Sequence, residues 1–320
     1  MTTAAPVEQQ LEQYRVELTA YCYRMLGSLD AEDAVQETFI RAWRGFDRFE
    51  GRSALRSWLY RIATNVCLDM LEGRKRRARP MDLGPAAEPI VENLRTSDQL
   101  WIEPMPDVRV VPEGDPADVV AARESVRLAF VAALQELPPR QRAVLILCEV
   151  LRWKAAEVAE LLETSVASVN SALQRARATL EASGVTPARA ASVEAPDPEL
   201  LRRYVDAFER YDMEALTSLI VEDATQSMPP FDLWLAGRDD ILAWWVGPGN
   251  GCRGSRMLPV ESSNGAPAFG QYKPSESGVG YEPWALQVLE IEDGRIVELT
   301  FFLDVEKLFP RFGLPLEFPG

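Results

Sequence analysis

Residues 137–180 carry the pattern that most restricts how this chain can fold: LPPRQRAVLILCEVLRWKAAEVAELLETSVASVNSALQRARATL. Apolar residues recur there at three- and four-residue steps, as in helices that bury one face. The segment therefore predicts three short helices, and the last pair has the spacing of a helix-turn-helix. Ser165 follows the break and predicts the start of the final helix, because its hydroxyl can accept a backbone N–H two or three residues on.

Polar side chains occupy the outward face predicted for that final helix. Short amides and hydroxyls come near its start, and guanidinium groups come farther along. This distribution suits a helix in a DNA major groove, where amides read base edges and arginines contact phosphates or guanine. The predicted DNA-binding residues are Ser168, Asn170, Ser171, Gln174, Arg175 and Arg177. An ordinary surface helix is the alternative interpretation of the same pattern.

The N-terminal third reads LGSLDAEDAVQETFIRAWRGFDRF and then EGRSALRSWLYRIATNVCLDMLEGRKRR. Together with 137–180, these stretches resemble regions two and four of the sigma-70 family of bacterial RNA polymerase sigma factors, in the small extracytoplasmic-function group. The motifs DAEDAVQETFIRAW, SWLYRIATN and LPPRQRAV…EVAELL…SVNSALQRAR stand in the family's order and at compatible distances. The chain departs from the family at the helix-turn-helix break, where Glu163 replaces a frequent glycine, and at Ala172, where a basic residue is common.

The resemblance gives the first predicted helix, 31–46, a role in binding the polymerase clamp. Asp30 is expected to be its N-cap. The residues that match the clamp-binding surface are Asp33, Gln36, Glu37 and Arg41. A solvated helix face with an i,i+4 pair between Glu37 and Arg41 is the alternative.

The following loop at 50–53 and the helix to about residue 73 match the family's surface for the −10 promoter element. Strand opening requires unstacked bases to be held by matching polar groups. The matching residues are Arg52, Ser53, Arg56, Arg61, Asn65, Arg74, Lys75, Arg76 and Arg77. The basic run at 74–79 also fits a solvated helix end, favoured by the helix dipole.

The net charge of −15 is unevenly distributed along the chain. Residues 1–80 carry +2 and residues 121–182 carry +1, whereas 81–120 carry −7 and 183–320 carry −11. The two predicted DNA-binding parts therefore neutralise few phosphates, and intrinsic DNA affinity should be weak. The resemblance implies that core RNA polymerase, through its β and β′ subunits, supplies most of the grip on promoter DNA.

Residues 81–120 are rich in proline and acid and predict a linker without an ordered helix. Its stretch TSDQLWIEPMPD carries four apolar residues that must dock somewhere, and both region two and the C-terminal domain are open as docking partners. The boundaries that follow are 1–80 for region two, 81–120 for the linker, 121–182 for region four, 183–197 for a second linker and 198–320 for a separate domain.

The last domain predicts helices first and then four strands, at 255–263, 267–273, 282–292 and 295–303, with Asn-Gly and Asp-Gly turns. In YVDAFERYDMEALTSLI, LAGRDDILAWW and VLEIEDGRIVELTFFLD it resembles SnoaL-like domains of the polyketide-cyclase and nuclear-transport-factor superfamily. The expected fold class is thus multidomain: two all-α sigma domains followed by an α+β SnoaL-like cone with a curved antiparallel sheet.

Trp234, Arg238, Trp284 and Asp304 are the residues predicted to line a ligand cavity in that domain. Members of the superfamily include enzymes with Asp–His or Asp–Arg machinery, but the chain contains no histidine. Any catalysis would need an Asp–Arg pair such as Asp232 and Arg238, and the tryptophans are equally compatible with a core. We expect a regulatory domain without catalytic residues, with a small molecule as a candidate ligand.

Cofactors and metals are not expected, because the four cysteines lie far apart without a CxxC pair. The first residues lack an export signal and no apolar stretch approaches a membrane span, which predicts a cytoplasmic protein without a membrane partner. A dedicated anti-sigma partner is left open. The functions weighed are a transcription initiation factor, a one-component DNA-binding regulator with a sensing domain, and a SnoaL-like enzyme.

Overall fold

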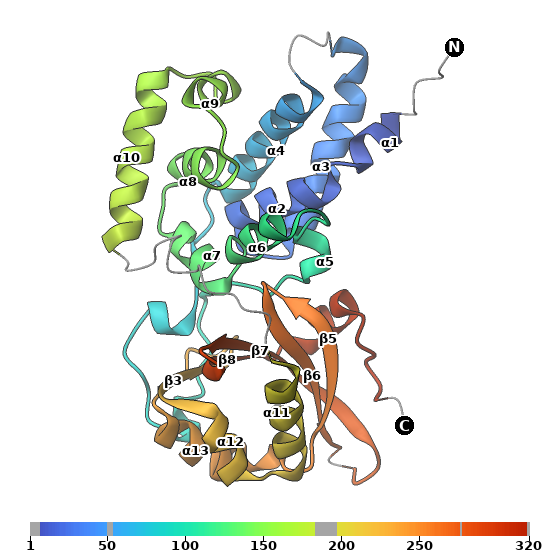
Figure 1. Cartoon of the computed structure of the whole chain (residues 1–320), viewed down its shortest axis with the longest axis vertical. Coiled ribbons are helices and arrows are strands. Elements are labelled where there is room, and N and C mark those ends of the chain that lie inside the picture. The colour runs from blue at the N-terminus through green and yellow to red at the C-terminus, as the bar shows by residue number, and fades with distance from the viewer. Residues whose placement is uncertain (1–6, 50–53, 183–196, 276, 319–320) are drawn as a thin grey trace. The chain divides into compact units, whose positions relative to one another are not determined.

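The computed structural model describes residues 7–49, 54–182, 197–275 and 277–318 (Figure 1). The chain forms two compact units that interleave along the sequence. One unit comprises residues 1–77 and 102–191, and the other comprises residues 78–101 and 192–320. No helix among the described residues is long and apolar enough to cross a bilayer.

The helical unit contains two groups of helices. The first group is α1 (Val7–Glu12), α2 (Arg15–Leu26), α3 (Asp30–Gly45), the 3-10 turn η1 (Phe46–Arg48) and α4 (Leu55–Leu71). The second is α5 (Asp107–Val110), α6 (Pro116–Glu124), α7 (Leu128–Gln135), α8 (Pro139–Leu145), the π-helical turn η4 (Ile146–Val150), α9 (Ala155–Leu161) and α10 (Val166–Ala182). Helices α2, α3 and α4 pack on one another, and α10 packs on α8 and α9 (Figure 1).

A network of buried arginines joins α2 to the start of the second group. Arg142 of α8 is 3% exposed, and its guanidinium donates to the carbonyl oxygens of Leu134, Gln135, Leu137 and Met25. Arg24 of α2 is equally buried and donates to Ser125. Neither guanidinium has a carboxylate partner in these bonds, and burial lowers the pKa of each to about 10.

Two expectations about local structure are wrong. Asp30 is the first residue of α3 and not its cap, because its carboxylate pairs with Arg74 and Arg77 instead.

The predicted linker contains the short helices α5 and α6. Helix α6 forms because the side chain of Asp115 accepts from Ala117 N and Pro116 occupies the first helical position, which together start a helix inside a proline-rich stretch.

The predicted linker is divided between the two units. Its first part, residues 81–101, contains η3 (Val91–Asn93) and β2 (Leu100–Trp101) and belongs to the C-terminal unit. That unit begins at residue 78, so it also includes η2 (Pro80–Asp82), and the short strand β1 (Arg77–Ala78) lies where the chain passes from one unit to the other. We call residues 84–101 the strap. It is bonded to the start of β4 and to the segment before it: Ala87 N donates to Trp234 O at 2.9 Å, Asp232 N donates to Arg95 O at 2.9 Å, and Trp101 Nε1 donates to Pro230 O at 3.0 Å.

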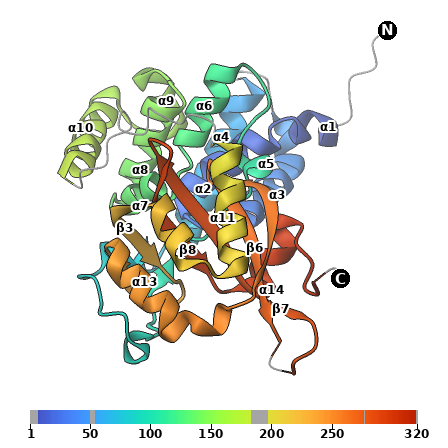
Figure 2. The same ribbon diagram turned by 60° about the horizontal axis from the view of Figure 1, so that its bottom comes forward.

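The remainder of the C-terminal unit is an α+β cone. Its helices are α11 (Pro198–Arg210), α12 (Met213–Leu219), α13 (Arg238–Val246), η6 (Pro248–Cys252), α14 (Val305–Leu308) and η7 (Phe309–Phe312). Its strands are β3 (Ile220–Ser227), β4 (Trp234–Ala236), β5 (Arg256–Ser263), β6 (Ala266–Pro274), β7 (Tyr281–Glu292) and β8 (Arg295–Phe302). Helices α11, α12 and α13 cover one face of the curved sheet and enclose the apolar core (Figure 2).

The six-stranded sheet has the order β4-β3-β8-β7-β6-β5. The four predicted strands are confirmed, and their turns have left-handed backbones at Asn264, Gly265, Asp293 and Gly294. The sheet is mixed and not wholly antiparallel, because β3 pairs with β8 in parallel. The sequence did not predict β3 and β4, because the stretch IVEDATQS is largely polar and its extended form is held by pairing with β8 and β4.

Tyr204 of α11 begins a buried hydrogen-bond chain that ties this helix to the sheet. Its hydroxyl donates to Gln287 Oε1 at 2.6 Å, and Gln287 Nε2 donates to Gln271 Oε1 at 2.8 Å. Burial raises the pKa of Tyr204 far above the usual value for tyrosine.

The raised pKa of Tyr204 predicts that the folded protein loses stability in alkali. Above about pH 10 the unfolded tyrosine releases its proton while the folded one keeps it, so the free energy of unfolding falls by up to about 1.4 kcal/mol per pH unit. Tyr204→Phe should remove this part of the slope. The measurement is denaturant unfolding of both proteins at pH 9.5, 10.5 and 11.5, and identical slopes would contradict the assignment.

Candidate nucleic-acid interface

Helices α9 and α10 form the helix-turn-helix that the sequence predicts. Val158 and Leu161 of α9 and Val169, Ala176 and Leu180 of α10 are buried on the facing sides. Ser165 Oγ accepts from Ser168 N at 3.1 Å, which confirms the predicted start of α10. Glu163 in the turn adopts φ +51°, a left-handed backbone that disfavours side chains and explains why glycine is common there.

All six residues predicted to read DNA on α10 are exposed: Ser168, Asn170, Ser171, Gln174, Arg175 and Arg177. Both cations of this set, Arg175 and Arg177, already have partners. Arg175 Nη1 donates to Ser171 Oγ at 2.6 Å, one turn earlier on the same helix. Arg177 forms an ion pair with Glu149 of η4. Arg177 is therefore held beside its own domain, whereas Asn170 and Gln174 remain on the outward surface.

Helix α4 presents the predicted −10 residues toward the helix-turn-helix. Arg56 pairs with Glu17 of α2 at 3.0 Å, and its guanidinium lies 5.5 Å from the ring centre of Trp153, which precedes α9. Tyr60 contacts the same tryptophan, with ring centres 5.1 Å apart. Arg61 Nη2 donates to Glu160 O of α9 at 3.3 Å. Helix α4, which is predicted to bind the −10 element, thus contacts α9 and the segment before it, and α9 is the first helix of the helix-turn-helix.

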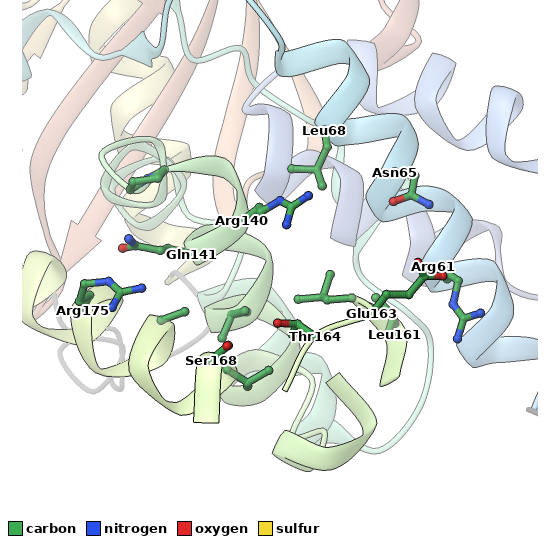
Figure 3. Close-up of a pocket in the computed structure, with 15 residues that line it drawn as sticks. Arg61, Asn65, Leu68, Arg140, Gln141, Leu161, Glu163, Thr164, Ser168 and Arg175 are labelled. Atoms are coloured by element: carbon green, nitrogen blue, oxygen red, sulfur yellow. The ribbon is translucent and has the colours of Figure 1, made fainter. Parts of the chain in front are cut away.

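A hollow of about 400 Å³ lies between these helices (Figure 3). Arg61 and Asn65 line it from α4, and Ser168 and Arg175 line it from α10. Arg140 and Gln141 of α8 and the turn residues Glu163 and Thr164 complete the polar part of the wall. The structure therefore brings predicted −10 and −35 residues to one shared space, which the sequence did not indicate.

The basic run after α4 is paired with acidic side chains. Arg74 and Arg77 bond to Asp30, with nitrogen–oxygen distances of 3.1 and 3.3 Å, and Arg77 also pairs with Glu103. Arg76 pairs with Glu136. Contact with a phosphate would have to replace these pairs. The predicted residues Arg52 and Ser53 lie outside the described residues.

Helix α3 carries a mixed polar and apolar surface. Glu37 accepts from Arg41 at 2.7 Å, and Arg41 also donates to Asp69 at 3.1 Å, so the i,i+4 pair predicted as the alternative is present. Asp33 and Gln36 are exposed. Sequence reasoning missed two exposed apolar side chains on this face, Ile40 and Trp43, the latter 61% exposed. The available signal was their spacing, because Ile40 follows Gln36 by four residues and Trp43 follows Ile40 by three.

The C-terminal unit contains a separate cavity of about 250 Å³ with mainly apolar walls. Of the four residues predicted to line a ligand cavity, Trp284 lines this one. Trp234, on β4, is half-buried and its indole donates to Gly84 O at 2.9 Å. Arg238 begins α13 and Asp304 precedes α14, and neither lines the cavity. Among the described residues, no three His, Cys, Asp or Glu side chains group as metal ligands.

Family comparisons divide the chain in the same way. A model described as sigma-70 region 2 matches residues 11–77, and a model described as sigma-70 region 4 matches residues 127–180. A model described as a SnoaL-like domain matches residues 201–299. The three matches reproduce the order that the sequence motifs predict.

Two curated relatives align along nearly the whole chain. The ECF RNA polymerase sigma factor SigG of Mycobacterium tuberculosis (strain CDC 1551 / Oshkosh) is 49% identical over 312 residues, which cover 95% of this chain and 82% of that protein. SigJ of M. tuberculosis (strain ATCC 25618 / H37Rv) is 28% identical, with 96% and 94% covered. The crystal structure of M. tuberculosis SigJ matches with a TM-score of 0.59 at 23% identity over 97% of this chain and 99% of that one, a likeness of fold.

Proposed function

The chain belongs to the extracytoplasmic-function group of RNA polymerase sigma factors and is thus a transcription initiation factor. From this premise we propose that α10 reads the −35 promoter element and that α4 binds the −10 element. We propose further that α3 binds the clamp of core RNA polymerase. Its partners are then core RNA polymerase, with contacts to β and β′, and promoter DNA, and its place of action is the bacterial cytoplasm. The observation that carries this proposal is the exposed polar face of α10 on a buried helix-turn-helix core.

The chemistry of α10 fits a major groove. Asn170 and Gln174 lie one turn apart on the exposed face and present amides, which pair with the N6 and N7 atoms of adenine. Arg175 can donate to the O6 and N7 atoms of guanine in the same groove. Ser168 and Ser171, nearer the start of the helix, suit phosphate or base contacts.

Helix α4 contributes the polar groups that hold bases during strand opening. Asn65 is exposed and can pair with the edge of an unstacked base. Arg61 and Arg56 lie one and two turns toward the start of the same helix and can follow the phosphate chain. Their present partners, Glu160 O and Glu17, are exchanged for DNA in this proposal.

Binding of DNA requires the shared hollow to open. The hollow has a volume of about 400 Å³ and is bordered by Arg61 and Asn65 of α4, whereas a major groove that admits a helix is about 12 Å wide and bordered by two phosphate chains. Ser168 and Arg175 are exposed but line this hollow together with Arg61 and Asn65 of α4, so a duplex seated on α10 needs α4 to move aside. The contacts to be released are those of Trp153 with Tyr60 and Arg56, each about 0.5–2 kcal/mol. The buried bonds that Arg142 donates to Met25 O and that Gln135 Nε2 donates to Arg24 O in α2 would also have to break.

Weak intrinsic DNA binding is consistent with this arrangement. Residues 1–80 and 121–182 are close to neutral in net charge, so polymerase must provide most phosphate contacts. A one-component regulator would instead bind duplex DNA unaided and would not need the α3 surface. We expect little binding of the free chain to duplex promoter DNA.

The experiment that tests the proposal is transcription by reconstituted holoenzyme on genomic fragments, with start sites mapped. Gln174→Ala and Arg175→Ala should each reduce initiation about 5- to 150-fold and relax the −35 preference, because a bidentate base contact contributes about 1–3 kcal/mol. Thr179→Ala, on the same helix but one turn beyond Arg175, is the matched control. If the chain starts no transcripts with core polymerase, or if both variants equal Thr179→Ala, the proposal is wrong.

We propose that the C-terminal domain regulates the sigma regions and is not an enzyme. Its cavity is not lined by Arg238 or Asp304, and the whole chain lacks histidine. The strap, which belongs to the connector between regions two and four, is instead bonded to this domain. A domain that holds the connector can influence how far the two DNA-binding regions separate.

A further inference from the structure

The cavity of the C-terminal unit has aromatic walls and one cation. Phe208, Trp244, Trp245 and Phe301 provide apolar surface from α11, α13 and β8. Lys273 of β6 lines the cavity, and its ammonium lies 4.1 Å from the ring centre of Trp284. Cavities of this size take small ligands that bury most of their surface against apolar walls, with a few polar groups fixing orientation.

Lys273 is the charged group available to orient such a ligand. Its side chain is 18% exposed and pairs with Glu282 at 3.0 Å. Glu282 lies outside the cavity lining and is 40% exposed, so this pair is partly solvated. An ammonium has three donors, and a ligand anion can accept from one while Glu282 keeps another. The other polar groups of the wall, such as Gln226 and Tyr211, already bond to Trp245.

The strap supplies part of the cavity wall. Leu94 lines the cavity and packs against the core of the C-terminal unit, beside Phe231. The residues that follow bond to the chain near Phe231: Thr96 bridges to Phe231 itself, and Ser97 Oγ donates to Asp232 Oδ1 at 2.7 Å. A molecule in the cavity would therefore contact the connector between the sigma regions directly.

We propose that this cavity binds a small aromatic anion, oriented by Lys273, and that the bound molecule holds the strap in place through Leu94. The ligand class follows from the walls and the cation: a planar one- or two-ring body with a carboxylate or sulfonate. Occupancy adds apolar contacts to Leu94 that the empty cavity lacks, so ligand binding and strap docking stabilise each other.

The test uses the full-length chain with 2-naphthoate as the probe and naphthalene as its uncharged match. Binding is followed by tryptophan fluorescence, because Trp244, Trp245 and Trp284 line the cavity. We expect 2-naphthoate to bind more tightly than naphthalene. Lys273→Met should lower the affinity for 2-naphthoate about 10- to 150-fold, since a hydrogen bond to a charged group contributes about 1.5–3 kcal/mol. The same variant should change the affinity for naphthalene by no more than about twofold.

Hydrogen exchange of the strap provides the second readout. 2-Naphthoate should slow exchange of the Ala87 and Asp232 amides, which donate across the strap contact. Leu94→Ala should abolish this slowing, whereas Val91→Ala, at an exposed strap residue that does not line the cavity, should preserve it. Naphthalene binding checks that each variant is folded.

Three results would each overturn the proposal. The first is no saturable fluorescence change with 2-naphthoate. The second is equal affinity of the wild-type chain and Lys273→Met for 2-naphthoate, which removes the role of the cation. The third is binding that leaves strap exchange unchanged, which removes the coupling through Leu94.

Discussion

Trp43→Ala is expected to weaken the affinity of the chain for core RNA polymerase by about 30-fold or more. Trp43 is 61% exposed on α3, on the face that also carries Gln36 and Ile40. Exposed tryptophans at protein interfaces are frequent hot spots, and truncating one costs about 2–4 kcal/mol of binding. The measurement is a titration of labelled chain with core enzyme, together with the midpoint of transcription against chain concentration.

The control for Trp43→Ala is Val108→Ala, which removes an equally exposed apolar side chain from α5. Both variants should keep the free energy of unfolding within about 0.5 kcal/mol, because both sites are on the surface. Equal affinities of Trp43→Ala and the wild-type chain would show that the clamp contacts a different face of the helical unit.

Arg142→Met is expected to lower the free energy of unfolding of the helical unit by about 3–5 kcal/mol. Methionine fills much of the same volume but donates no hydrogen bond, so the carbonyl oxygens of Leu134, Leu137 and Met25 would lose their bonds to this guanidinium in a buried site. Removing a buried charged donor costs far more than an exposed one because its former partners remain desolvated.

Denaturant unfolding followed by far-UV circular dichroism measures this effect, with Arg140→Met as the control on the same helix. Arg140 is exposed, so its replacement should change stability by no more than about 0.5 kcal/mol. A similar small change for Arg142→Met would mean that water replaces the lost donors and that the network is not what holds α7 and α8 together.

Local patterns predicted most of the secondary structure because each depends on residues close in sequence. The helix-turn-helix follows from the spacing of apolar residues and the cap at Ser165, and the strand turns follow from Asn-Gly and Asp-Gly pairs. Strand β3 was missed because its extended form depends on β8, some 70 residues away. Asp30 was misassigned because a cap and an ion pair use the same carboxylate, and only the fold brings Arg74 and Arg77 to it.

The candidate site was predicted residue by residue, but its arrangement was not. Exposure of Asn170, Gln174 and Asn65 matches the expectation that these groups face outward. Nothing local in the sequence shows that Arg61 and Arg175 line one hollow, since that depends on the packing of α4 against α8 and α9. For the same reason the sequence left open which domain the connector docks on, and Leu94 was not a candidate for any cavity.

The division of the connector constrains how this protein can be dissected. The backbone changes unit at residues 77–78, at 101–102 and again at 191–192, so neither unit is a single stretch of sequence. Deleting residues 198–320 would leave Leu94 and Trp101 stripped of the apolar surface they now cover, and such a fragment would be prone to self-association for reasons unrelated to promoter choice. A protease site introduced between residues 183 and 196 avoids this artefact. After cleavage, the C-terminal fragment would stay bound to the strap, which is part of the N-terminal fragment, and the two fragments would form a non-covalent heterodimer.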